Sequence, residues 1–167
     1  MTGFKRRPRV LIRLLMKWMY SQELTLLYDT YKNFRRADVD ATKVKAQFMS
    51  LAELWVLADK FAIPALQNHV ILSMGRIQEV TCTYPWVTCK YIYQNTTINS
   101  ALRRHIIDNC VKVGFSGLSV FESSTINPYP TELCVDIVKR CFAFGAEKTE
   151  FDIIFSHFDY YVDTGTD

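Results

Sequence analysis

Residues 51–68, which read LAELWVLADKFAIPALQN, are the most informative part of the chain. Ahead of the proline, apolar side chains recur at intervals of three, one, three and three residues, the spacing of one face of an α-helix. The residue before a proline avoids the helical region, so Pro64 ends this helix and can begin the next. We therefore predict two helices joined by a sharp corner at Ile63 and Pro64. The stripe expected to face the core consists of Leu51, Leu54, Trp55, Ala58 and Phe61.

Capping signals set the expected limits of these two helices. Ser50, followed three residues later by Glu53, matches a capping box, so the first helix is expected over about 48–62. Gly75 is a typical helix stop, so the second is expected over 64–74.

The rest of the chain is also mainly helical in its apolar spacing, and the expected fold class is mostly α. Residues 31–43 are polar without a period and predict an exposed loop. Residues 84–93 are short and aromatic and fit either a helix or a strand. Further helices are expected at residues 9–27, 100–113 and 130–142.

The composition is that of an ordinary globular domain. The chain has 167 residues, of which 49% are apolar and 22% charged, a mixture unlike that of disordered chains. It contains no run of 18 apolar residues, so no membrane-spanning helix is expected. Five cysteines, an odd number without a secretory signal, indicate reduced thiols. We therefore expect a cytoplasmic or nuclear protein.

Charge is divided unevenly between the two ends of the chain. Residues 1–36 hold nine basic and two acidic side chains, a net of +7, although the whole chain carries only +3. This basic head fits a nuclear-localisation cluster, a membrane-surface helix or a mitochondrial presequence, or else the solvated edge of an ordinary helix. Residues 150–167 hold five acidic and no basic side chains, a net of −5.

The acidic end also has the apolar period of a helix. Between residues 151 and 162, large apolar side chains recur at i, i+3, i+4, i+7, i+10 and i+11. Such a segment either docks on its own domain as a terminal helix or folds into the groove of a partner. Phe155 and Phe158 are its central apolar residues.

Sequence signatures of catalysis and metal binding are lacking. The six glycines form no phosphate-binding loop, and no two cysteines have the CxxC spacing of zinc or redox sites. His105 and Cys110 lie five residues apart, so an enzyme with a Cys–His site remains an alternative that mutating both residues would test. We predict a protein that is not an enzyme, with no catalytic, cofactor-binding or metal-ligating residues.

Three segments resemble one family, the BTB/POZ domains. Residues 8–24, PRVLIRLLMKWMYSQEL, look like the "PxxF…xWLYTGxL" helix of that family. Residues 51–68 resemble its "LxELYxLADKYxIPxLxN" helix–corner–helix, which follows in the same order. Residues 95–104, NTTINSALRR, are similar to the "NTxxxSxLR" stretch in the helical extension of BTB proteins from filamentous fungi.

The resemblance implies a partial BTB/POZ domain over residues 1–75 and a helical extension with the acidic tail over residues 76–167. The strands and hairpin that begin the family's domain, and that form much of its dimer interface, have no counterpart in this sequence. The first helix would then lose its packing partners. It would expose an apolar patch of Val10, Leu14, Leu15 and Trp18, so we expect the protein to bind a hydrophobic dye or to self-associate. Trp18 is alternatively a core residue.

The function implied is a non-catalytic protein–protein interaction module that associates with itself or with another protein. One alternative is a nucleic-acid-associated regulator that uses the basic head. Another is an adaptor for a cullin-type ubiquitin ligase, because residues 51–53 fit the hydrophobic-x-acidic motif of some family members. No cofactor and no membrane partner are expected. The expected interface residues are Val10, Leu14, Leu15, Leu51, Glu53, Phe155 and Phe158.

Overall fold

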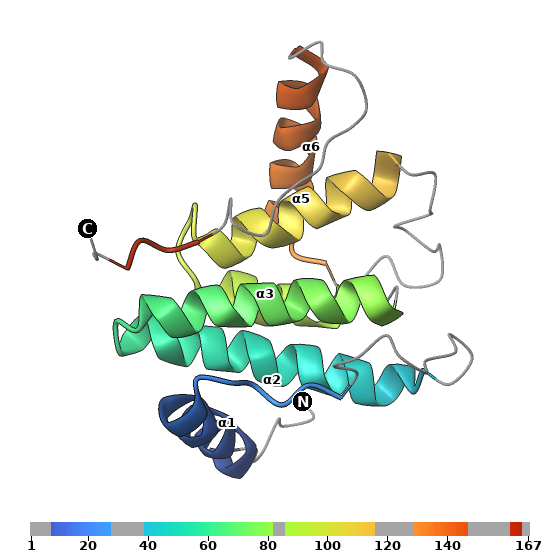
Figure 1. The fold of residues 1–167 in the computed structure, drawn as a ribbon. Helices are drawn as coiled ribbons and strands as arrows, with labels where there is room; N and C mark the ends of the chain where they lie inside the picture. The colour runs from blue at the N-terminus through green and yellow to red at the C-terminus, as the bar shows by residue number, and fades with distance from the viewer. Residues whose placement is uncertain (1–7, 28–38, 82–85, 116–128, 147–160, 165–167) are drawn as a thin grey trace. The chain divides into compact units, whose positions relative to one another are not determined.

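The computed structural model describes residues 8–27, 39–81, 86–115, 129–146 and 161–164. This part of the chain contains six α-helices and one short 3-10 helix and no strand, which confirms the mostly α class (Figure 1). None of its helices has the length and hydropathy needed to cross a membrane. The helices are α1 (Pro8–Ser21), α2 (Ala41–Lys60), α3 (Pro64–Thr81), η3 (Trp86–Thr88), α4 (Cys89–Asn95), α5 (Ala101–Phe115) and α6 (Thr131–Ala146).

The chain forms two compact units, which are described separately. Unit 1 comprises Met1–Tyr84 and Val162–Asp167, and unit 2 comprises Pro85–Tyr161. Unit 1 therefore contains α1 to α3, and unit 2 contains η3 and α4 to α6.

The corner predicted between α2 and α3 is confirmed. Phe61 is the C-cap of α2, and Ala62 adopts a left-handed conformation with φ 51°. The Ile63 N–H donates to the Ala58 carbonyl at 2.9 Å, and the Ala62 N–H donates to the Asp59 carbonyl at 3.1 Å. These two bonds form a Schellman motif, which satisfies carbonyls that the end of a helix leaves unpaired. Pro64 then begins α3 without the loss of a helical hydrogen bond.

The start of α2 differs from the prediction. The helix begins at Ala41, because the Asp40 side chain accepts hydrogen bonds from the backbone N–H groups of Thr42 and Lys43. The Lys43 N–H is the main cause that lowers the pKa of Asp40. The predicted loop up to residue 43 is therefore wrong from Ala41 onward. The Ser50 capping box is also wrong, since Ser50 lies inside the helix and donates to the Ala46 carbonyl.

Four of the five residues in the predicted core stripe are buried in unit 1. Phe61 is the exception, with 61% of its side chain exposed. The reason is its position at the C-cap, where the backbone leaves helical geometry and turns the side chain off the stripe. The buried stripe instead continues upstream to Phe48 and Val44, both fully buried. The four buried members are Leu51, Leu54, Trp55 and Ala58.

Helix α3 continues two turns beyond its predicted end and packs along α2 (Figure 1). Gly75 lies buried inside α3, so its prediction as a helix stop is wrong. A glycine inside a helix costs about 1 kcal/mol relative to alanine. Burial of the next turn, where Ile77 is fully buried, offsets that cost because one such side chain contributes about 2 kcal/mol.

Helix α1 is shorter than predicted and is followed by an extended return. It ends at Ser21, where Gln22 takes a φ of 56°. The segment after it buries Leu24 and Leu26. The side chain of Gln47 on α2 holds this segment, since it accepts from the Leu27 N–H at 3.1 Å and donates to the Thr25 carbonyl at 3.2 Å.

Residues 162–164 return to unit 1 and are not helical. The Asn68 side chain of α3 donates to the Val162 carbonyl at 2.7 Å and accepts from the Val162 N–H at 2.5 Å. This reciprocal pair fixes the backbone at Val162. The predicted helix over 151–162 is wrong at Tyr161 and Val162, and the rest of it lies outside the described residues.

In unit 2, residues predicted as either helix or strand form η3 and α4, and α5 extends two residues beyond its predicted end at residue 113. Arg103 of α5 joins these helices. Its guanidinium donates to the Tyr93 and Thr96 carbonyls and to the Thr96 hydroxyl, and it stacks on the Tyr93 ring at 4.3 Å. The end of α4 is thereby tied to the start of α5.

Two phenylalanines of the α2 segment test this account of the core. We expect Phe48→Ala to lower the free energy of unfolding by about 3–5 kcal/mol, because it removes a fully buried ring. Phe61→Ala should change it by no more than about 0.5 kcal/mol, because that ring is exposed. Urea denaturation followed by circular dichroism measures both. Equal losses for the two variants would contradict the assigned core.

Candidate protein-interaction surface

One side of α1 attaches the helix to unit 1. Trp18 is 7% exposed, and its indole Nε1–H donates to Nδ1 of His69 on α3 at 3.2 Å. Leu11, Leu14 and Leu15 are half-buried on the same side. Because a tryptophan buried at one edge of a helix sets the rotation of that helix, the opposite side of α1 is directed away from the core.

The bond from Trp18 requires an imidazole with an unprotonated Nδ1. Burial lowers the pKa of His69, and the nearby positive charge of Arg76 lowers it further, while Glu23 acts in the opposite direction. Burial and the Arg76 charge thus favour the neutral ring that can accept this bond.

The side of α1 turned away from Trp18 carries a second row of apolar side chains. Ile12, Met16 and Met19 lie at i, i+4 and i+7 and are 57%, 44% and 58% exposed. At 3.6 residues per turn they share one face of the helix. We call these three residues the outer stripe. Methionine is flexible and polarisable, which suits a surface that adapts to a partner.

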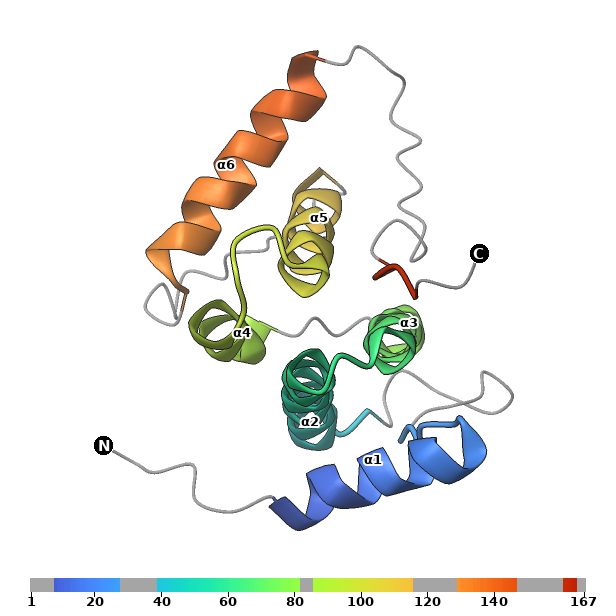
Figure 2. The same cartoon turned by 90° about the vertical axis from the view of Figure 1, so that its left-hand side faces the viewer.

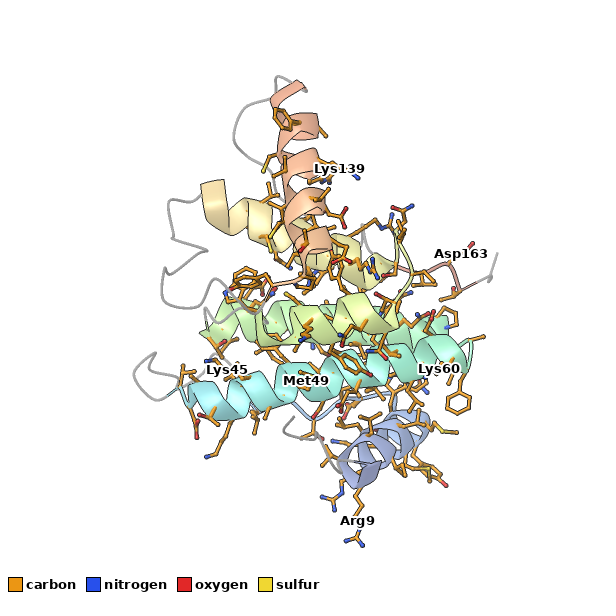
Figure 3. The ribbon with its side chains drawn as sticks, turned by 180° about the vertical axis from the view of Figure 1, so that it is seen from behind. Arg9, Lys45, Met49, Lys60, Lys139 and Asp163 are labelled. Carbon is orange, nitrogen blue, oxygen red and sulfur yellow. The ribbon has the colours of Figure 1, made fainter. Side chains whose placement is uncertain are left out.

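A row of basic side chains borders the outer stripe. Arg9, Arg13 and Lys17 lie at i, i+4 and i+8, and all three are exposed. We call them the basic edge; Figure 3 shows Arg9 projecting from α1 on the side away from α2. Lys17 donates to the Thr25 hydroxyl, whereas Arg9 and Arg13 have no hydrogen bond or ion pair within the described residues. Since α1 contains no acidic residue, its outer surface is apolar and positively charged.

The predicted interface residues are scattered in the structure. Val10 is exposed but lies beyond the basic edge, while Leu14 and Leu15 are partly buried. Leu51 is 1% exposed in the core of unit 1 and is not available to a partner in this structure. Glu53 is partly exposed on α2 and already interacts with another residue.

Two further predictions concern aromatic residues. Phe155 and Phe158 lie outside the described residues. The prediction that Trp18 belongs to the exposed patch is wrong, because its hydrogen bond to His69 and its burial make it a core residue. Tyr20, two residues further along α1, is 84% exposed.

The outer stripe itself was missed by sequence reasoning. Its signal was present, because Ile12, Met16 and Met19 have helical spacing of four and three residues. The same helix has a second apolar row, Leu11, Leu14, Leu15 and Trp18, with equally good helical spacing. When a helix carries two apolar rows, the sequence spacing does not show which row faces the core. The buried position of Trp18 in the structure decides it.

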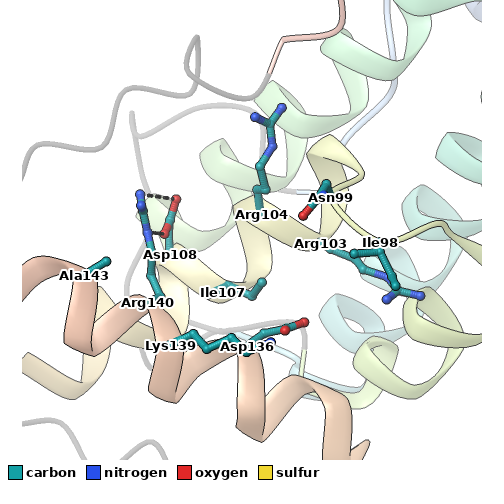
Figure 4. A pocket seen from close by; sticks show the side chains of 10 residues that line it. All are labelled: Ile98, Asn99, Arg103, Arg104, Ile107, Asp108, Asp136, Lys139, Arg140 and Ala143. Carbon is teal, nitrogen blue, oxygen red and sulfur yellow. Dashed lines mark hydrogen bonds and ion pairs between the residues drawn. The ribbon is translucent and has the colours of Figure 1, made fainter.

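Unit 2 contains a pocket of about 510 Å³ that is lined by α5, α6 and the loop before α5 (Figure 4). Several of its charged groups are engaged in contacts within unit 2. Arg140 donates from two nitrogens to the Asp108 carboxylate at 2.5 and 3.2 Å, as Figure 4 shows. The Tyr93 hydroxyl donates to the Asp136 carboxylate at 3.0 Å, and burial raises the pKa of Tyr93. We assign these pairs to holding the helices of unit 2 together.

Of the four cysteines described in unit 2, Cys89 and Cys110 are buried, Cys141 is partly exposed and Cys134 is exposed. Cys110 and His105 both lie buried on α5, and burial raises the pKa of the Cys110 thiol, so this thiol stays protonated at neutral pH. Burial likewise raises the pKa of Cys89 to about 12. Among the described residues, no group of three or more His, Cys, Asp or Glu side chains is arranged to hold a metal ion.

Comparison with known proteins adds no relative. No family model matches the chain, and neither a curated protein nor a solved structure matches it.

The lowered pKa of His69, which burial and the Arg76 charge cause, should make the stability of unit 1 depend on pH. The folded-state pKa of His69 is lowered, so its contribution is complete above the unfolded value of 6.5 and is lost as pH falls below it through the folded value. We expect the free energy of unfolding to fall more between pH 7.5 and 5 for the wild type than for His69→Gln. Urea denaturation at several pH values measures the difference, and parallel curves for the two proteins would contradict this assignment.

Proposed function

We propose that this chain is a non-catalytic protein-interaction module of the BTB/POZ-like kind and that α1 is its binding helix. The observation that carries the proposal is the outer stripe, a row of exposed apolar side chains beside a basic edge on a helix fixed by Trp18. The partner that fits this chemistry is an amphipathic helix whose apolar face is flanked by acidic residues. Its apolar side chains would cover the stripe, and its carboxylates would face Arg9 and Arg13.

A protein partner fits the outer surface better than a nucleic acid does. Binding to DNA depends on the number of phosphates that basic side chains neutralise, and the basic edge has only three such residues. The rest of the basic head, residues 5–7 among it, lies outside the described residues, and the outer stripe would contribute nothing to phosphate contacts. A membrane-surface helix buries its whole apolar face in the lipid. In α1, one of the two apolar rows already packs against the rest of unit 1.

The size of the stripe sets the expected strength of binding. Each of its three side chains is about half exposed, so covering it gains roughly 1 kcal/mol, or about 3 kcal/mol for the stripe. Much of this is offset by the loss of freedom on association. The helix alone therefore supports a weak, reversible contact, and charge complementarity decides which partners are selected.

Two designed peptides test the proposal on the full-length chain. One is an 18-residue amphipathic helix with acidic flanks, and the other has the same apolar face with lysine at every acidic position. We expect the acidic peptide to bind at least tenfold more tightly by fluorescence anisotropy, because a like-charge contact is unfavourable. Met16→Glu should abolish binding, whereas Phe61→Glu, which places the same charge on an exposed aromatic site outside α1, should not.

Two further ligands distinguish other classes of partner. A 20-base-pair DNA duplex and vesicles that contain anionic lipid are titrated under the same conditions. Preferential binding of either, lost on Met16→Glu, would overturn the proposal in favour of that ligand. Equal binding of both peptides, or binding that is insensitive to Met16→Glu, would also overturn it.

A further inference from the structure

We propose that the ligand of α1 is the acidic carboxyl-terminal segment of a second copy of this chain, residues 150–163. The inference rests on the proposed function of α1 and names its partner. Two copies would exchange these segments around a twofold axis, so that each outer stripe is covered by the tail of the other copy. An exchange of this kind closes on itself and gives a dimer rather than a filament.

The spacing of apolar residues in the two segments is the same. The outer stripe lies at Ile12, Met16 and Met19, and the tail carries Phe151, Phe155 and Phe158. Both sets therefore have the positions i, i+4 and i+7. In helical form each set covers seven residues, or about 10 Å, so the two rows match in length. Ile154 adds a further apolar side chain beside the phenylalanines.

The charges of the two segments are opposite and unmixed. Helix α1 contains basic and no acidic residues, and residues 150–167 contain five acidic residues and no lysine or arginine. In the tail, Asp152 and Asp159 lie next to phenylalanines, as Arg13 lies next to the outer stripe. The surface of α1 requires a partner segment with an apolar row and acidic flanks, and residues 150–163 have that sequence pattern.

The anchor at Val162 favours a second copy over the same copy. The two hydrogen bonds from Asn68 fix Val162 on α3. In Figures 1 and 2, residues 162–164 and α1 lie on opposite sides of the α2–α3 pair, all within unit 1. The outer stripe faces away from α2 as well. The anchor at Val162 thus lies across both helices from α1 of the same copy, and the exchange places the tail on α1 of a second copy.

Charge reversal in the full-length chain tests the exchange. We expect the wild type to dimerise in analytical ultracentrifugation. Arg9→Glu with Arg13→Glu should weaken dimerisation at least tenfold, because like charges would then face each other. Asp152→Lys with Asp159→Lys should weaken it similarly. Combining all four substitutions should restore the wild-type dimerisation constant to within about threefold.

A matched control uses two lysines of α2. Lys45 and Lys60 are exposed and lie near the two ends of α2, away from α1 (Figure 3). Lys45→Glu with Lys60→Glu makes the same change in net charge as the arginine pair and should leave dimerisation unchanged. Carbodiimide cross-linking, which joins a lysine amine to a carboxylate, is applied to a mixture of isotope-labelled and unlabelled chains. It should join Lys17 to the tail only between copies.

The outcomes separate the inference from the proposed function. Four outcomes would each overturn the exchange. They are a monomeric wild type, tail variants that dimerise normally, cross-links within one copy, and a variant with all four substitutions that does not regain dimerisation. If the designed acidic peptide still binds α1 in those cases, the proposed function stands and its partner is another protein. If that peptide also fails to bind, both proposals fall.

Discussion

The left-handed turn at Ala62 is the constraint on which unit 1 depends. A non-glycine residue in this conformation costs about 1–2 kcal/mol. The two hydrogen bonds of the Schellman motif, at about 1 kcal/mol each, offset that cost, and Pro64 commits the chain to a new helix. Because the turn brings α3 back along α2, the buried residues of the two helices form one core. The residues that receive α1 and the returning tail, His69 and Asn68, then lie next to each other on α3.

The position of α1 follows from that core through a single directional contact. Apolar packing alone would leave α1 two choices of rotation, since it carries apolar residues on two sides. The indole of Trp18 resolves the choice, because its N–H donates to Nδ1 of His69 while its ring is buried. The consequence is that Ile12, Met16 and Met19 remain outside. The hydrogen bond and the buried ring of Trp18 thus set the rotation of α1. This rotation determines which residues of the helix form its exposed surface.

The sequence predicted the helical class, the corner at Pro64 and most of the inner stripe, because these depend on local periodicity and on proline geometry. It did not predict where helices begin and end. Asp40 rather than Ser50 caps α2, because its side chain accepts from the Thr42 and Lys43 N–H groups. Gly75 lies inside α3, because burial of the following turn outweighs the local preference of glycine. It also placed Leu51 at the interface, although that residue is buried. Whether an apolar position faces the core or the solvent depends on packing partners that periodicity does not identify.

The two groups of basic residues in this chain show why a surface and not a pocket is the better candidate for binding. In unit 2, Arg140 is paired with Asp108, and Arg103 is engaged by backbone carbonyls and an aromatic ring. These cations hold helices together and would lose that role on binding a ligand. Within the described residues, Arg9 and Arg13 form no hydrogen bond or ion pair. They border the outer stripe, whose exposure to water is unfavourable in free energy. A contact that covers this row gains free energy from both features, and it leaves every hydrogen bond that positions α1 intact.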